Sequence, residues 1–237
     1  MYGAIIGDLA AWTYRHEKDV FKAQLVSPEA KLSEVGLAVL AMDKMMRELK
    51  PDVEWEKIVS TFKEVLPPQS NEVATVVPVW TEFLKGTPHI PNRVKRVALL
   101  ATDIVAGWQD DPREAAFAWG RRFHGTKEEH YTEQIAEIIC RLRHGASKQE
   151  AMQGIVCIED WTVDGNDFVG PLCYAHQAWR CFDEAADFDE AIRKAMQSPL
   201  DDPYRLAALS GAFAEAMWGC PDDLRNRCWG VICDLIK

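Results

Sequence analysis

The sequence lacks the patterns that identify several common classes of protein. It has no uncharged apolar run of about 18 residues, which disfavours a membrane-spanning helix. Its start has no basic segment before a long apolar one, and Asp8 interrupts the apolar run early, so we expect no signal peptide. No P-loop, no G-x-S-x-G or H-E-x-x-H motif and no dinucleotide-binding fingerprint is present. No single short motif therefore assigns a reaction.

Basic residues are fewer than acidic ones, with 27 Lys and Arg against 37 Asp and Glu and a net charge of −10. Nucleic-acid binding needs clustered positive charge, so this balance disfavours a nucleic-acid partner. The seven cysteines contain no C-x-x-C pair, which disfavours a zinc site and is typical of reduced thiols in the cytoplasm. We therefore expect a cytoplasmic protein with no membrane or nucleic-acid partner.

What the sequence does contain is helical periodicity. Apolar residues recur at helical spacing in residues 34–49 and 54–65, and helical patterns follow in residues 111–123, 128–143 and 171–185. The segment 205–219 is rich in small residues, which lets another helix approach closely. Helix boundaries are indicated at Asp111-Pro112, Ser147 with Glu150, Asp187 with Glu190, and Gly219 followed by Pro221. With no strand run, repeat or linker, the sequence predicts an all-α fold, a single compact multi-helix domain over residues 1–237.

Two segments at the ends of the chain carry recognisable motifs. The start, MYGAIIGD, resembles a Met-x-Gly-Ala-Ile-x-Gly-Asp opening, and residues 188–227 resemble a closing run. That run has a Phe-x-x-Ala-Ile helix, a Gly-Gly-Asp-x-Asp-Thr turn and an Ala-Ala-x-x-Gly-x-x-Ala-Glu-Ala helix. Both belong to the bacterial ADP-ribosylglycohydrolase family, which this chain resembles. The resemblance implies the all-helical fold of that family and hydrolysis of N- or O-glycosidic ADP-ribose linkages. It also implies two Mg²⁺ ions held by carboxylates and Thr hydroxyls.

At the implied metal ligands the sequence departs from the family pattern. A Thr-Asp-Asp motif falls on Leu32-Ser33-Glu34, which keeps one carboxylate. In the second ligand turn, Asp202 (or Asp201) stands for the first Asp, Tyr204 for the second and Arg205 for the Thr. An arginine at a ligand position repels a divalent cation. We therefore expect no metal or other cofactor, and any ion that did bind would use Glu34, Asp201 and Asp202.

Other family positions are also replaced. A gating Glu falls on Arg15, and a Gly-Asn-Gly-like turn falls on residues 96–98 or, in a rival alignment, on Ser70-Asn71. A His-containing turn falls near His124-Gly125.

The new arginines have two readings. Arg15 and Arg205, beside Tyr204, could clamp a phosphate or carboxylate and so bind ADP-ribose or a nucleotide. Alternatively, the two arginines form salt bridges with Glu34 or Asp202 and leave a filled, inert pocket.

Several further residues have a structural and a functional interpretation. Asp8 is a remnant of the site or a buried helix cap, and Asp201 and Asp202 bind a weak cation or cap the helix that begins near Pro203. His124 and His130 either lie at helix ends or act in catalysis. The aromatic residues Tyr174, Trp179 and Phe182 either pack in the core or stack on an adenine.

The leading prediction is a catalytically inactive relative, a pseudoenzyme that acts as a binding, regulatory or immunity-type protein with a protein or nucleotide partner. No catalytic residue is assigned beyond the remnants Asp8, Glu34 and Asp202. The alternatives are an active ADP-ribosyl hydrolase with altered or single-metal chemistry, and an ADP-ribose or nucleotide-binding module.

Overall fold

Helices build every regular element in the part of the chain that the structure describes. The computed structural model describes residues 1–17, 19–20, 22–65, 92–124, 129–155, 171–199 and 203–236, and these contain no strand. The all-α prediction is therefore confirmed for these residues. The helices are α1 (Tyr2–Thr13), α2 (Glu34–Glu48), α3 (Trp55–Val65), α5 (Asn92–Ala106), α6 (Pro112–His124), α7 (Glu129–Arg143), α8 (Lys148–Met152), α10 (Pro171–Asp183), α11 (Phe188–Met196), α12 (Pro203–Trp218) and α13 (Asp222–Ile236).

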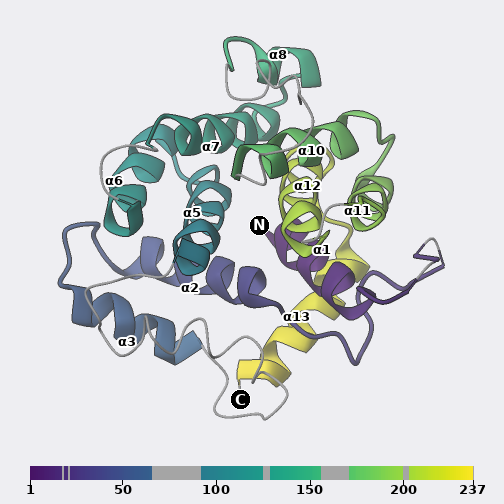
Figure 1. Cartoon of the computed structure of the whole chain (residues 1–237), viewed down its shortest axis with the longest axis horizontal. Helices are drawn as coiled ribbons and strands as arrows, with labels where there is room; N and C mark the ends of the chain where they lie inside the picture. The colour runs from purple at the N-terminus through teal and green to yellow at the C-terminus, as the bar shows by residue number, and fades with distance from the viewer. Residues whose placement is uncertain are drawn as a thin grey trace.

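Two buried helices, α1 and α12, form the centre of the molecule (Figure 1). Every residue from 3 to 11 in α1 and from 204 to 216 in α12 is buried. A helix that is buried on all sides carries apolar residues all round, which is why these two show little amphipathic pattern. Around α12 lie α7, α10 and α11, while α13 packs beside α1.

Glycines allow α1 and α12 to cross at very short range. A Cβ at Gly3 would overlap the carbonyl oxygen of Gly211, and a Cβ at Gly7 would overlap that of Ala207. The small residues of 205–219 were predicted to admit a neighbouring helix, and α1 is that helix. Glu215 adds a polar contact, since its carboxylate accepts the backbone N–H of Gly3 at 2.8 Å at the start of α1.

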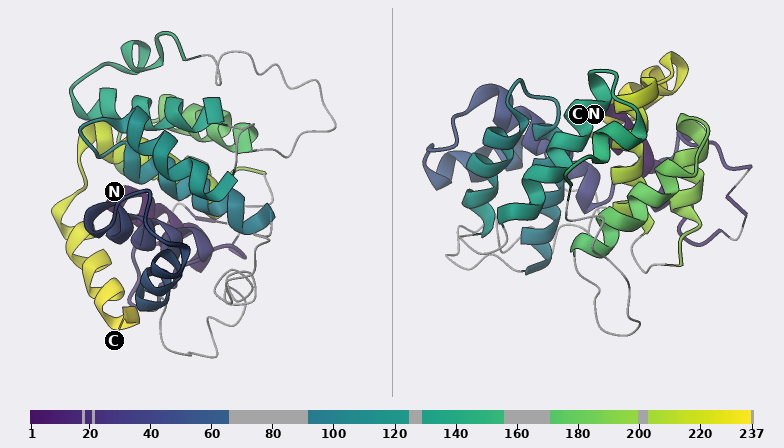
Figure 2. Two further views of the ribbon diagram at one scale, coloured as in Figure 1. Left: turned by 90° about the vertical axis from the view of Figure 1, so that its left-hand side faces the viewer. Right: turned by 90° about the horizontal axis from the view of Figure 1, so that it is seen from above.

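The second group of helices contains α2, α5, α6 and α7, and the views in Figure 2 show it beside the α1–α12 pair. It packs against that pair through α7 on α12 and α2 on α1. The fold is thus one helical unit with a shared core rather than two separate cores.

Most predicted helix boundaries agree with the structure. Asp111 accepts the backbone N–H of Glu114 at 3.0 Å, and Ser147 with Glu150 forms a capping box. Asp187 accepts the N–H of Glu190, and Gly219 has φ +77° after the end of α12. One placement was wrong: residues 96–98 lie inside α5 and form no turn, and Ser70-Asn71 falls outside the described residues.

No helix among the described residues is both long enough and apolar enough to cross a membrane. The cysteines Cys140, Cys181, Cys220, Cys228 and Cys233 are free, and of these Cys181 and Cys228 are buried.

Candidate functional site

Three segments that are distant in the sequence meet where α1, the start of α2 and the start of α12 come together. Asp8 comes from the middle of α1, Ser33 and Glu34 from the head of α2, and Tyr204 and Arg205 from the first turn of α12. All five are buried. These are the positions to which the sequence resemblance assigns the family's site, so we call this set the Asp8–Arg205 cluster.

Asp8 holds the N-cap residue of α2, Ser33, in place. Its Oδ2 accepts the backbone N–H of Ser33 at 2.8 Å, and its Oδ1 accepts the Ser33 hydroxyl. The Ser33 oxygen in turn caps α2 by accepting the N–H of Val35 at 3.0 Å. The interpretation of Asp8 as the cap of its own N-terminal turn is therefore wrong, because the cap is Ser33 and Asp8 orients it.

The protonation of Asp8 is shifted by its surroundings. Full burial raises the pKa of this carboxyl from 3.8 to about 7, although the two hydrogen bonds from Ser33 favour the charged form. Glu34, next to Ser33, adds a smaller effect in the same direction as burial. Asp8 therefore titrates close to neutral pH in the folded protein.

Glu34 is held by a cation from the far end of the chain. Nη2 of Arg205 lies 3.3 Å from Oε1 of Glu34, and the two residues are 7% and 2% exposed. Opposite charges that are both removed from water interact much more strongly than a surface pair, and each one compensates the buried charge of the other. This is the salt bridge that one of the two sequence interpretations describes.

Aromatic side chains close the space around Arg205. Its guanidinium carbon lies 5.7 Å from the ring centroid of Tyr174. Tyr204 packs edge-on against Trp12, with ring centroids 5.4 Å apart. Both tyrosines are buried, so aromatic rings shield the cluster from solvent.

Arg15 occupies a different environment from Arg205. It is exposed, its guanidinium carbon lies 4.2 Å from the Trp12 ring centroid, and it donates to the Trp12 carbonyl at 2.5 Å. The structure therefore places Arg205 in the interior and Arg15 on the outer surface of the Trp12 ring.

The described residues at the implied ligand positions do not fit a pair of magnesium ions. Leu32 is a buried apolar side chain, the Ser33 hydroxyl is bonded to Asp8, and Glu34 faces Arg205. Mg²⁺ needs hard oxygen donors in a near-octahedral shell, and a fixed guanidinium opposes a second cation. Within the described ranges no group of three or more His, Cys, Asp or Glu side chains is placed to hold a metal.

Some predicted residues cannot be placed, or belong to the core. Asp201 and Asp202 lie outside the described residues, as do the side chains of His124, which ends α6, and His130, which lies in α7. Trp179 and Phe182 are core residues, with ring centroids 5.1 Å apart and both packed against Phe213.

Two buried acids were missed by sequence reasoning. Glu215 binds the start of α1, and Asp103 lies in α5 with no hydrogen-bond partner for its Oδ1 among the described residues. Burial, reinforced by Glu133, raises the pKa of Asp103 well above its usual value. The segment ATDIVAG gave a usable signal, because it places an acid among the apolar residues of the second half of α5.

Comparison with described protein families and with curated proteins finds no match to this sequence.

Proposed function

We propose that this chain is a catalytically inactive relative of the ADP-ribosylglycohydrolases, which keeps the helical scaffold and acts by binding rather than by hydrolysis. Two observations support the relationship. The chain is all-helical over the described residues, and the two end segments that carry the resemblance meet residues 32–34, the position aligned with the first ligand motif, in one cluster although all three are far apart in sequence. A fold can persist while its site changes, because different residues specify the core and the site.

The buried ion pair between Arg205 and Glu34 carries the proposal of inactivity. Glu34 is the one carboxylate that remains in the first ligand motif, and it lies 3.3 Å from a guanidinium. To bind a divalent ion, Glu34 would have to leave that partner, and the ion would lie beside a buried positive charge. The arginine supplies the charge compensation that a metal ion gives in the active family.

A turnover assay tests this proposal. The purified protein is incubated with ADP-ribose linked to arginine, to serine and to a small alcohol, with and without Mg²⁺ or Mn²⁺, and release of free ADP-ribose is measured. The proposal predicts no release above that of an Asp8→Asn, Glu34→Gln double variant. Metal-stimulated release that this variant abolishes would establish an active hydrolase instead.

A second candidate function, binding of ADP-ribose or a nucleotide, is favoured by the exposed Arg15. Its guanidinium lies on the surface over the Trp12 ring, where its charge is accessible to a phosphate. Calorimetry with ADP-ribose tests it. Saturable heat that is lost in Arg15→Ala and kept in Arg121→Ala supports binding at Arg15, and no heat at all removes this candidate. Arg121 is a suitable control because it is an exposed arginine over another aromatic ring, Phe117 in α6.

A further inference from the structure

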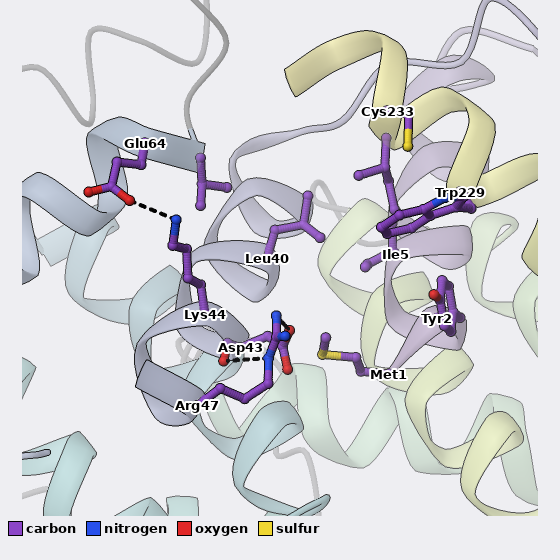
Figure 3. A pocket seen from close by; sticks show the side chains of 12 residues that line it. Met1, Tyr2, Ile5, Leu40, Asp43, Lys44, Arg47, Glu64, Trp229 and Cys233 are labelled. Carbon is purple, nitrogen blue, oxygen red and sulfur yellow. Dashed lines mark hydrogen bonds and ion pairs between the residues drawn. The ribbon is translucent and has the colours of Figure 1, made fainter. Parts of the chain in front are cut away.

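A hollow of about 830 Å³ lies away from the Asp8–Arg205 cluster, between α1, α2, α3 and α13 (Figure 3). We call it the α2–α13 groove. It shares no residue with the cluster, because its lining comes from the start of α1, residues 40–47 of α2, the end of α3 and α13. Ile5, Leu40 and Ile232 make it apolar. A groove of this size and character is large enough to receive a bulky side chain from another molecule.

An exposed tryptophan lines one wall of this groove. Trp229 in α13 is 56% exposed, and it is the one exposed large hydrophobic side chain among the described residues. Figure 3 shows its ring near Tyr2 and Cys233, across the groove from the charged side chains of α2. Tryptophan in a groove with an apolar lining is the residue type that most often dominates the binding energy of a protein interface.

The charged wall of the groove is neutral as a whole. Lys44 lies 2.7 Å from Glu64, and Arg47 lies 2.5 Å from Asp43. These two cations and two anions cancel, whereas the whole chain carries a net charge of −10. Two copies of an acidic protein repel each other over most of their surface, so a neutral apolar face is the place where they can meet.

We propose that the α2–α13 groove is a self-association surface, in which a second copy of this chain inserts its Trp229 and receives the first copy's Trp229 in return. Such a twofold contact needs the anchor and the receiving groove on the same face, and this face carries both. A charged small molecule fits less well, because the paired side chains leave no excess of either sign to attract it. This inference is independent of the proposed function.

Sedimentation and light scattering of the full chain test the proposal between about 1 and about 300 µM, the range in which modest interfaces dissociate. We expect a concentration-dependent dimer. Trp229→Glu should weaken dimerisation by about 30-fold or more, as expected for a dominant interface residue. The matched control is Gly230→Glu, which adds the same charge to the next residue of α13, where the surroundings are open and exposed.

A second measurement needs no variant. Cys233 lines the groove, whereas Cys140 lies in α7, and both are partly exposed free thiols. Alkylation followed by peptide mass spectrometry should show Cys233 becoming slower to react as protein concentration rises, with Cys140 unchanged. A wild-type protein that stays monomeric throughout, or a Trp229→Glu protein that dimerises as well as Gly230→Glu, would overturn the proposal.

Discussion

Replacing Arg205 by Met removes the cation from the Glu34 ion pair and keeps an apolar side chain in the same space. Glu34 then has a buried negative charge without its guanidinium, at a position that is 2% exposed. Removing one partner of a buried pair costs about 3–5 kcal/mol, because the desolvation of the remaining charge is no longer compensated. We expect Arg205→Met to lower the free energy of unfolding by that amount.

A double-mutant cycle separates the energy of the ion pair from the energy of side-chain packing. Glu34→Gln alone leaves Arg205 without its carboxylate, whereas the double variant removes both charges together. Replacing a buried pair by neutral groups of similar volume is often nearly neutral, so the double variant should be more stable than Arg205→Met. Urea unfolding of all four proteins at one pH gives the coupling energy, which we expect at about 2 kcal/mol within the range for contacting residues.

Simple additivity would refute this reasoning. If the effects of the two single variants add to within about 0.5 kcal/mol, the side chains do not interact in solution. A loss of less than about 1 kcal/mol in Arg205→Met would show that Glu34 is hydrated rather than buried. Arg205→Lys serves as a control, since it keeps the charge and should lose less stability than Arg205→Met.

Three further perturbations test other parts of the account. Asp8 binds its proton more tightly when folded, at a pKa of about 7 against 3.8, so its stabilising contribution should be lost as pH rises from about 4 to about 7. Asp8→Asn should remove this part of the pH dependence of the free energy of unfolding, which is on the order of 4 kcal/mol between about pH 4 and pH 7. If the free energy of unfolding of the variant falls with pH as much as that of the wild type, Asp8 is not the group responsible. Gly7→Ala should destabilise the α1–α12 crossing by several kcal/mol or prevent folding, whereas Gly230→Ala should raise stability by up to about 1 kcal/mol, as thermal unfolding will show. Restoring both ligand motifs with Leu32→Thr, Ser33→Asp, Tyr204→Asp and Arg205→Thr together should create a rise in melting temperature with Mg²⁺ that wild type lacks, and equal responses in both proteins would contradict the proposed loss of the metal site.

Local sequence signals predicted most of the helix boundaries because caps depend on neighbouring residues. Ser147 and Glu150 satisfy each other's backbone groups within a single turn, so the pattern identifies the helix start without knowledge of the fold. The same holds for the Asp111-Pro112 start of α6. Residues 96–98 were assigned to a turn by alignment from Gly107-Trp108 in the family pattern, and such an alignment carries no information about the local helix α5.

The cluster itself was only partly predictable. The sequence identified Asp8, Glu34 and Arg205 as a related set, and it offered the Arg205–Glu34 salt bridge as one of two interpretations. That Asp8 bonds Ser33 depends on how α1 crosses the head of α2, which no local pattern encodes. The unequal burial of Arg15 and Arg205 likewise follows from packing around Trp12 and Tyr204 rather than from residue type.

We propose that Arg205 takes the place of a divalent cation beside Glu34, and a direct measurement of metal binding tests this best. Mn²⁺ is titrated into the wild-type protein and into Glu34→Gln, with free Mn²⁺ followed by electron paramagnetic resonance up to about 1 mM, well above the needs of a built site. The account predicts no saturable binding that depends on Glu34. Saturable binding of two Mn²⁺ per chain in the wild type, lost in Glu34→Gln, would contradict it.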